Sequence, residues 1–357
     1  MTTQPAAPPP TQAAANRLLA NLFSTPINSA VSVLVLLVLA WLAPKLVAWA
    51  VINAVFVPDP QACRAAKGAC WGFIVEKLRL MTFATYPFEQ QWRPLLVVLI
   101  LLGLIGATMS TRLWGRKLWL AWGIGVPLMW LLMRGGALGL PYVETEKWGG
   151  LPLTLILAAN GIVFSFPLAV VLALGRRSEL PVIRALSVAY IEIVRGVPLI
   201  TVLFMASLMI PLLLPDGFSV DKLLRAQIGF ILFAAAYEAE VVRGGLQAVP
   251  RGQYEAADAL GLSYWHKTGF IILPQALKVV IPPMVNTFIG FLKDTSLVII
   301  IGLFDLLGAV RLASSDVEWR QFYVEGLVFV GLVYFALCYT MASYSRRLEL
   351  RLNATGR

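Results

Sequence analysis

Long stretches without a charged side chain constrain this chain more than any other feature. Several windows of about 18 or more residues lack Asp, Glu, Lys and Arg, and a helix of that length crosses a hydrocarbon core about 30 Å thick. Composition agrees, because 59% of the residues are hydrophobic and only 13% are charged, whereas soluble domains are roughly half apolar. We therefore expect an all-α polytopic membrane protein.

The apolar windows predict about eight transmembrane helices. Their approximate bounds are Asn28–Ala50, Pro94–Ser110, Leu118–Met133, Leu153–Leu174, Leu199–Leu214, Ala226–Leu246, Val279–Leu303 and Gly326–Tyr344. Residues 28–150, which hold the first three of these helices and the segments that connect them, carry most of the Trp residues, as expected of lipid-facing helices anchored at the interfaces. The predicted organisation is a flexible tail (1–27), a scaffold (28–148) with an outer loop (51–93), a core (149–346) and a second tail (347–357).

The distribution of Lys and Arg predicts the orientation of the chain. Basic residues gather in the short loops around residues 112–117, 176–195 and 243–278 and after residue 346, while the opposite loops hold most of the acidic residues. By the positive-inside rule, both termini and the segment 251–274 are cytoplasmic. The net charge of +10 does not indicate nucleic-acid binding, because the basic residues form no stripe with aromatic residues.

The segment 251–274 reads as a polar, basic hairpin between two apolar segments. Its sequence contains Glu-Ala-Ala at 255–257, a glycine at 261, and Ile-x-Leu-Pro ending at Pro274. We expect a helix from about Gln253 to Leu260, a turn at Gly261, where glycine adopts a backbone conformation that other residues resist, and a second short helix ended by Pro274. The alternative is an amphipathic hairpin at the membrane interface in which this order of residues occurs by chance.

This hairpin resembles the EAA loop of ATP-binding-cassette importer permeases. Four further blocks match the polar amino acid permease family in order and spacing, and they begin at Gly149, Tyr190, Tyr237 and Asn286. The resemblance implies a five-helix type I importer core at the C-terminal side. The N-terminal extension is most similar to the second permease of general L-amino acid transporters of the Aap/Bzt type, in the bacterial inner membrane.

The resemblance implies that the hairpin docks into a cytoplasmic ATPase. The residues placed at that contact are Tyr254, Glu255, Ala256, Ala257, Gly261 and Pro274. No Gly-x-x-x-x-Gly-Lys-Ser/Thr phosphate loop occurs in the sequence, so the chain itself is expected to bind no cofactor, with ATP and Mg bound by the partner ATPase. His266 is interpreted as a solvent-facing histidine without a regulatory role.

Ionisable residues within predicted spans are the next candidates, because charge inside a bilayer is costly and faces a cavity or a partner. A carboxylate could meet the α-ammonium of an amino acid, and a cation its α-carboxylate. The candidate substrate-pathway residues are Glu238, Glu240, Asn286, Lys293, Asp294 and Thr295. The alternative is that Glu240–Arg243 and Lys293–Asp294 are structural ion pairs; for Glu240–Arg243 this alternative is favoured.

Prolines and cysteines give the remaining expectations. Pro198 is expected to begin the fifth span, and Pro282 and Pro283 to begin the seventh in the same way. Cys63 and Cys70 lie in the outer loop, on the oxidising side, where a disulfide and free thiols are both open. A metal site is not expected, because no His lies near them.

The reading that follows is a permease subunit for polar or general L-amino acids. Its expected partners are a homologous second permease, two ATPase subunits, a periplasmic binding protein, the amino acid substrate and the lipid bilayer. A gradient-driven secondary transporter or channel is the main alternative, because it too would have long apolar spans. A membrane-embedded enzyme is weaker, since no His, Cys or carboxylates cluster at catalytic or metal spacing.

Overall fold

The structure, a computed structural model, describes residues 20–110, 113, 115–215 and 220–354, with side chains through Leu350. Most of the predicted N-terminal tail, residues 1–19, and the last residues of the C-terminal tail, 355–357, lie outside the described residues. The chain divides into two compact units, residues 1–75 and 76–357, which are described separately here.

The first unit is dominated by a helix that buries none of its side chains. Helix α2 (Pro26–Val47) begins where the Thr25 hydroxyl accepts the Asn28 N–H at 3.1 Å, and a π-helical turn, Ala48–Ile52, extends it. The combined 27-residue segment has a mean hydropathy of 2.3. A helix that is apolar all round and buries no residue needs lipid or a partner around it.

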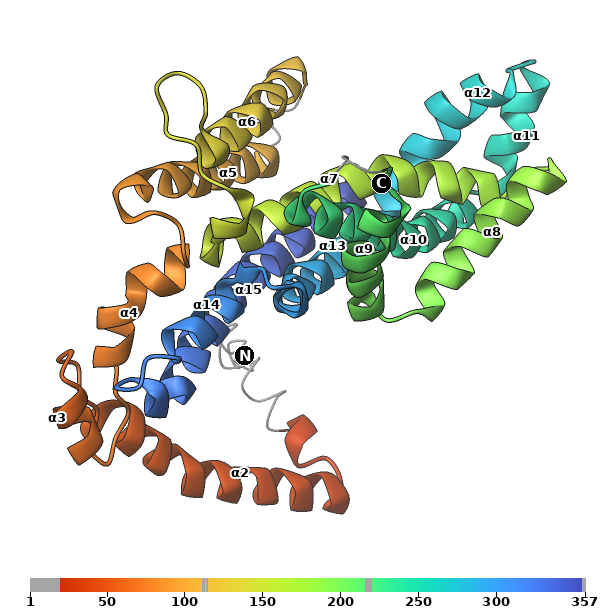
Figure 1. The fold of residues 1–357 in the computed structure, drawn as a ribbon. Coiled ribbons are helices and arrows are strands. Elements are labelled where there is room, and N and C mark those ends of the chain that lie inside the picture. Colours follow the sequence, from red (N-terminus) through yellow and green to blue (C-terminus); the bar gives the residue numbers. More distant parts are fainter. Residues whose placement is uncertain (1–19, 111–112, 114, 216–219, 355–357) are drawn as a thin grey trace, which may run out of the picture. The chain divides into compact units, whose positions relative to one another are not determined.

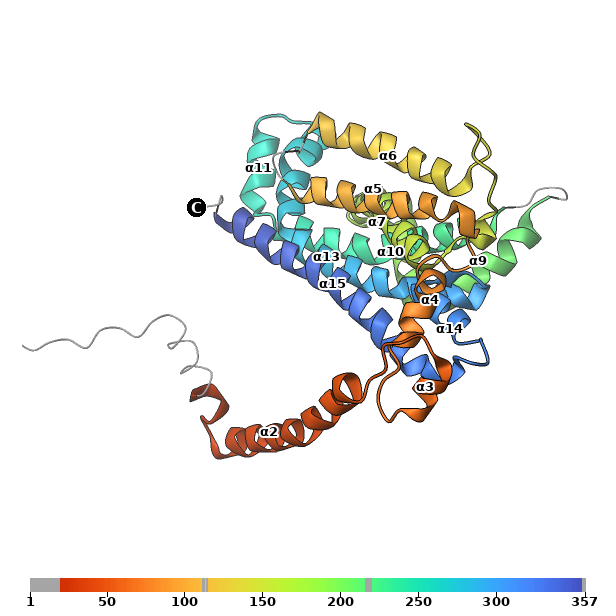
Figure 2. The same ribbon diagram turned by 90° about the vertical axis from the view of Figure 1, so that its left-hand side faces the viewer.

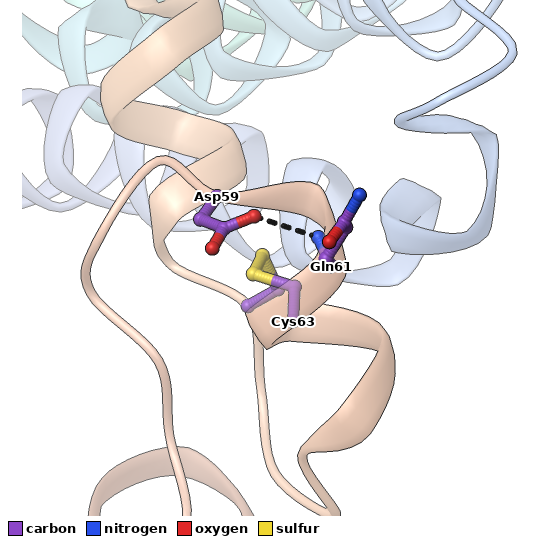
Figure 3. Close-up of a disulfide and its surroundings, with 4 residues drawn as sticks. Asp59, Gln61 and Cys63 are labelled. Carbon is purple, nitrogen blue, oxygen red and sulfur yellow. Dashed lines mark hydrogen bonds between the residues drawn. A yellow bond between two sulfur atoms is a disulfide. The ribbon is translucent and has the colours of Figure 1, made fainter.

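A small disulfide-closed loop follows in the same unit. Cys63, in α3 (Pro60–Ala65), is bonded to Cys70, with their Cα atoms 5.4 Å apart. Figure 3 shows this disulfide beside Asp59, whose carboxylate accepts the Gln61 N–H at 2.8 Å and so begins α3. Both cysteines are buried at 2% and 1% exposure, so the loop has a packed centre despite its small size.

The second unit is a helical bundle built on two helices of 27 residues. Helix α7 (Gly150–Arg176) packs along α10 (Lys222–Ala248), and α10 packs on α13 (Leu273–Asp294), which packs on α15 (Tyr323–Ala354) (Figure 1). Small residues line the α10 surface, including Ala235, Ala239 and Gly245. Such residues let helix backbones approach closely where lipid supplies no hydrophobic drive.

A helical pair precedes this bundle in the chain. Helices α5 (Trp92–Met109) and α6 (Arg116–Arg134) lie side by side (Figure 2), and α5 also packs on α7. The buried Arg93 guanidinium donates from Nη1 to the Pro141 carbonyl at 2.9 Å, and its Nε donates to the Leu132 carbonyl. A cation from α5 thus satisfies one carbonyl in the last turn of α6, where positive charge is favoured, and one in the segment that follows the helix.

Length and hydropathy identify five described helices that could cross a membrane, or six if a bent pair is counted as one span. The bent pair is α8 (Pro181–Gly196) and α9 (Leu199–Leu213), which meet at 105°. The predicted total of about eight also requires α6 and α10, and α10 carries Glu238, Glu240 and Arg243. Its charged groups are enclosed by neighbouring helices, so its own hydropathy understates how well it suits the bilayer.

Two expectations about proline are wrong. Pro274 does not end a second hairpin helix, and Pro282 and Pro283 do not begin the seventh span. The helix continues from α12 (Tyr264–His266) through a π-helical segment, Lys267–Ile272, and α13 into a 3₁₀ segment, Thr295–Ile301.

The physical reason is local relief of the lost backbone hydrogen bonds. A proline removes its own N–H and crowds the carbonyl four residues before it. Pro274 follows directly on the wider π-helical turns, and the carbonyls opposite Pro282 and Pro283 belong to Lys278 and Val279, which are exposed. Helices in membranes tolerate proline under such conditions.

A short connection closes the far end of the bundle. Gly149 and Gly150 form parallel bridges with Phe304 and Asp305, and the Thr154 hydroxyl accepts the Leu306 N–H at 2.9 Å. Asp305 also begins α14 (Leu306–Ala313), accepting the Gly308 N–H at 2.9 Å. Burial raises the pKa of the Asp305 carboxyl, and the N–H groups of Gly308 and Leu307, which donate to it, oppose that rise. The start of α7 is therefore clamped to a segment about 150 residues later in the chain.

Candidate functional site

The hairpin is formed by α11 (Arg251–Ala259), a turn at Gly261, and the helix that begins with α12. Gly261 has φ of +70°, and its N–H donates to the Asp258 carbonyl at 2.9 Å, while the Leu262 N–H donates to the Ala257 carbonyl at 3.2 Å. This pair of bonds is the Schellman motif that ends helices at a left-handed residue. The helix and glycine turn expected from the sequence are both present.

Steric crowding is not the reason for a glycine at this turn. A Cβ added to Gly261 would meet nothing within 4 Å. Its positive φ is what disfavours any other residue there, because L side chains resist the left-handed region. The sequence requirement at Gly261 therefore comes from the backbone conformation of the tip.

The outer surface of the hairpin combines exposed polar residues with three large apolar side chains. Leu260, Trp265 and Phe270 are 76%, 74% and 78% exposed. Glu255 and Ala256 are also exposed, but Ala257 is 1% exposed and faces the hairpin interior. Of the predicted contact residues, Ala257 thus serves internal packing, while Glu255, Ala256 and Gly261 remain on the free surface. Large apolar side chains held out at the tip are typical of a surface that meets a partner.

Polar contacts hold the two arms of the hairpin together. The Lys267 ammonium pairs with the Asp258 carboxylate, and the Gln275 amide donates to the Gln253 side-chain oxygen at 3.0 Å. His266 lies 2.7 Å from the Ser263 hydroxyl through Nδ1. These links cross between the arms or brace the turn, so the hairpin is a braced unit rather than a loose loop.

Tyr254 lies on the inner side of the hairpin, unlike Glu255 and Ala256. Its hydroxyl donates to the Leu246 carbonyl of α10 at 2.9 Å and accepts from Arg177 Nη1, beyond the end of α7, at 3.1 Å. The structure therefore places Tyr254, one of the residues predicted to contact the partner, at the base of the hairpin, where its side chain is partly buried. The hydroxyl connects the hairpin to two helices of the bundle.

Glu240 lies at the centre of an ion-pair cluster. Its carboxylate accepts from Arg243 at 3.0 Å, and it forms ion pairs with Arg176 at 3.1 Å and Arg195 at 3.7 Å. Arg176 also donates to Glu192 of α8 at 2.8 Å. Three arginines and two glutamates therefore join α7, α8 and α10. This arrangement supports the structural alternative for Glu240 over a contact with substrate.

The other candidate pathway residues do not gather at one point. Glu238 is fully buried, and its Oε1 accepts from Ser165 of α7 at 2.9 Å, while Oε2 has no partner among the described residues. Asn286 and Lys293 are exposed on α13, and Thr295 is buried with its hydroxyl donating to the Leu292 carbonyl at 2.8 Å.

Lys293 and Asp294 show no ion pair. Neither residue lies within 4.0 Å of an opposite charge among the described residues, and Asp294 is only partly buried. The structural ion pair weighed for these two residues is therefore absent from this part of the chain. Their side chains stay available on the α13 surface.

Sequence reasoning missed the roles of Arg176 and Arg177. Both were used only as part of the basic cytoplasmic loops, yet one binds Glu192 and Glu240 and the other binds Tyr254. A helix C-terminus is a favourable place for a cation, and two consecutive arginines at the end of a span were the available signal. Their partners come from distant segments and could not be read from spacing.

Comparisons with known proteins agree on a membrane component of transport systems. Residues 161–353 match the family described as binding-protein-dependent transport system inner membrane component. The chain is 50% identical to the inner membrane amino-acid ABC transporter permease protein YhdY of Escherichia coli K12, covering 94% of this chain and 92% of YhdY. It is 39% identical to the glutamate/glutamine/aspartate/asparagine transport system permease protein BztC of Rhodobacter capsulatus, covering 93% and 92%.

A solved structure matches the core of the chain. The crystal structure of an amino acid ABC transporter with histidines aligns with a TM-score of 0.51 and 29% identity, covering 57% of this chain and 92% of that one. The family model likewise matches only residues 161–353, in the C-terminal part of the chain. The two longer relatives, by contrast, extend over nearly the whole chain.

Proposed function

The chain belongs to the binding-protein-dependent transport system inner membrane component family, and we propose that it is the permease subunit of an ATP-binding-cassette importer for polar or general L-amino acids. The observation that carries this proposal is the braced hairpin with its exposed apolar tip. Such a surface, rigid and outside the apolar spans, is suited to receive movement from a partner. A multi-pass transport subunit, rather than a catalytic chain, is the role in keeping with this family.

Energy is proposed to come from a partner chain. The sequence holds no phosphate-binding loop of the Gly-x-x-x-x-Gly-Lys-Ser/Thr type, so ATP and Mg would be bound by two ATPase subunits. Glu255, Ala256 and Gly261 would face the ATPase, with Trp265 and Phe270 beside them. One chain has one hairpin, so two permeases are needed to serve two ATPases.

The second permease is proposed to be a different, homologous chain. A periplasmic binding protein would deliver the amino acid, and both termini would lie in the cytoplasm, as the distribution of basic residues favours. Alternating access would follow, with ATPase closure moving the hairpins and the helices behind them. Purification of the native complex with this permease alone beside the ATPase would contradict the heterodimer.

Substrate recognition is proposed to involve charged or polar groups on α10 and α13. Glu238 offers a buried carboxylate oxygen without a partner among the described residues, while Asn286, Lys293 and Asp294 lie on the α13 surface or partly within it. An α-ammonium and an α-carboxylate would find opposite charges there. The relative BztC is named for glutamate, glutamine, aspartate and asparagine, a set that shares those two groups.

The direct test is ATP-dependent uptake of a panel of labelled amino acids by the complex reconstituted with its neighbouring subunits. Gly261→Asp and Glu255→Lys should abolish most uptake while the two permeases still assemble, because one alters the turn of the hairpin and the other reverses an exposed charge on α11. Glu349→Lys is a matched control, since Glu349 is exposed on α15 and its charge change is the same.

Unchanged uptake in the two hairpin variants would remove the hairpin from the coupling mechanism. Uptake that persists without ATP and follows an imposed ion gradient would support the alternative, a secondary transporter or channel. The amino acid panel separately identifies the substrate class.

A further inference from the structure

Two consecutive arginines at the end of α7 bind different parts of the molecule. Arg176 Nη1 donates to Glu192 of α8 at 2.8 Å and lies 3.1 Å from Glu240 of α10. Arg177 Nη1 donates to the Tyr254 hydroxyl in the hairpin at 3.1 Å. The same helix end is therefore bonded to the hairpin on one side and to α8 and α10 on the other.

The Tyr254 hydroxyl completes a three-way link. It accepts from Arg177 and donates to the Leu246 carbonyl at 2.9 Å, and a hydroxyl can do both at once. The Arg177 guanidinium also lies over the Tyr254 ring, 5.7 Å from its centroid. A hydrogen bond from a charged donor is stronger than one from a neutral donor. The Arg177 guanidinium therefore holds the Tyr254 hydroxyl more firmly than a neutral donor would.

The bond from Tyr254 to Leu246 spans the place where the chain bends. Helix α10 ends at Ala248 and α11 begins at Arg251, so only Val249 and Pro250 separate them. Pro250 provides no side-chain cap to α11. Without the Tyr254 hydroxyl, the first arm would be held by two residues of backbone, by the packing of the Tyr254 ring against the bundle core and by the contacts of α11 with the following helical arm.

The second arm of the hairpin transmits movement by another route. It runs as continuous helix from Tyr264 into α13, so displacement of the tip reaches α13 through the chain itself. Helices α7 and α8 have no such covalent connection to the hairpin. Tyr254 and Arg177 supply the hydrogen-bonded connection to α7, and Arg176 extends it to α8.

We propose that Tyr254 and Arg177 form a mechanical joint that passes the displacement of the hairpin to α7 and, through Arg176, to α8. This inference rests on the proposed coupling function of the hairpin. Tyr254 is a positioning residue, because it touches neither ATP nor substrate. Its role is to keep ATP hydrolysis in the partner productive, so loss of the joint uncouples hydrolysis from uptake.

The test uses the reconstituted complex with uptake and ATP hydrolysis measured on the same vesicles. Tyr254→Phe keeps the ring and removes the hydroxyl, and uptake per ATP hydrolysed should fall by about 5-fold or more. Arg177→Ala should match it, Arg177→Lys should recover part of the ratio, and the double variant should fall no further than either single variant.

The control is Tyr339→Phe, because Tyr339 is 64% exposed on α15 and lies far from the hairpin in sequence. It should leave both activities unchanged. Gly261→Asp is included so that the two proposals are separated: if it leaves uptake intact, the coupling function of the hairpin fails whatever Tyr254 does.

Three results would overturn the joint while Gly261→Asp still abolishes uptake. The first is unchanged uptake and unchanged hydrolysis in Tyr254→Phe. The second is an equal fall in both activities, which would place Tyr254 in ATPase docking. The third is failure of the complex to assemble, which would make the hydroxyl purely structural.

Discussion

Helices α2 and α10 meet the bilayer in opposite ways. Helix α2 has no buried residue and no acidic side chain, and its sequence alone satisfies the requirement for a span. Helix α10 holds a fully buried Glu238 and the centre of a five-residue ion-pair cluster, and it suits the membrane only because α7, α8 and α13 surround those groups. Mean hydropathy therefore identifies α2, the helix that faces lipid. It understates how well α10, the helix at the centre of the core, suits the membrane.

The largest expected effect is on membrane insertion, when a carboxylate, which α10 tolerates, is placed in α2. Leu37 is 64% exposed near the middle of α2, and Leu37→Asp should make insertion about 3 kcal/mol less favourable. A translocon-insertion assay on the isolated segment measures this directly, with Leu37→Ala as control. Unimpaired insertion of the Asp variant would mean that α2 has a polar partner, and the contrast with α10 would break.

Packing at α10 should be the next most sensitive property. A Cβ at Gly245 would collide with Val280 Cγ1 and lie 2.8 Å from the Ala276 carbonyl oxygen, whereas one at Gly244 meets nothing within 4 Å. Gly245→Val should destabilise the protein by about 2–3 kcal/mol, because a crowded helix contact cannot accept added carbons. Gly244→Val is the matched control, since the neighbouring position changes identically.

Thermal unfolding in detergent compares the two glycine variants. Equal melting temperatures would show that α10 and α13 can separate without cost, contrary to the close packing described above. A lower value for Gly245→Val alone would sharpen the distinction between a helix that packs through small residues and α2, which has no buried residue.

Removing the charge of Glu240 should have a smaller effect. Glu240→Gln keeps the shape of the side chain but leaves three arginines facing one glutamate, and the side chain is 16% exposed. We expect a loss of about 2 kcal/mol, below the cost for a fully buried pair because solvent screens part of the charge. Glu349→Gln on α15 is the exposed control. A stabilised Glu240→Gln protein would show that the cluster does not support the fold.

The smallest effect should arise at the exposed Lys77–Asp316 pair. The hydrogen bond from Lys77, at 2.7 Å, lowers the pKa of Asp316, and the Glu318 N–H adds to this. A lowered pKa in the folded state gives stability that is present above the unfolded pKa of about 4 and is lost as pH falls below it. The melting temperature of wild type should therefore decline slightly more on acidification than that of Asp316→Asn. Parallel declines would remove the pair from the stability of the protein.

The sequence predicted the hairpin better than the helix that follows it. Glu255–Ala257 and Gly261 carried a local pattern whose backbone consequence, a left-handed turn, depends on one residue. Pro274, Pro282 and Pro283 were misread because proline ends many helices in water, but here π-helical geometry and exposed carbonyls absorb the lost hydrogen bonds.

Contacts between distant segments could not be predicted from the spacing of residues in the sequence. The partners of Glu240 lie on three helices, and the hydroxyl of Tyr254 points inward because of where α7 ends. A single sequence shows that charges occur in spans but not which ones meet. That is why Glu238 and Glu240 looked alike before the structure assigned one to a buried contact with Ser165 and the other to an arginine cluster.

The clamp between Gly149–Thr154 and Phe304–Leu306 has a consequence for the synthesis of the protein on the ribosome. The start of α7 leaves the ribosome about 150 residues before its partner does, a wait of about 10 to 30 s at ordinary rates of synthesis. During that interval the Gly149 and Gly150 backbone groups and the Thr154 hydroxyl must be satisfied by water, lipid headgroups or the insertion machinery. A segment in the last sixth of the chain is thus needed to satisfy the start of α7, the first helix of the core.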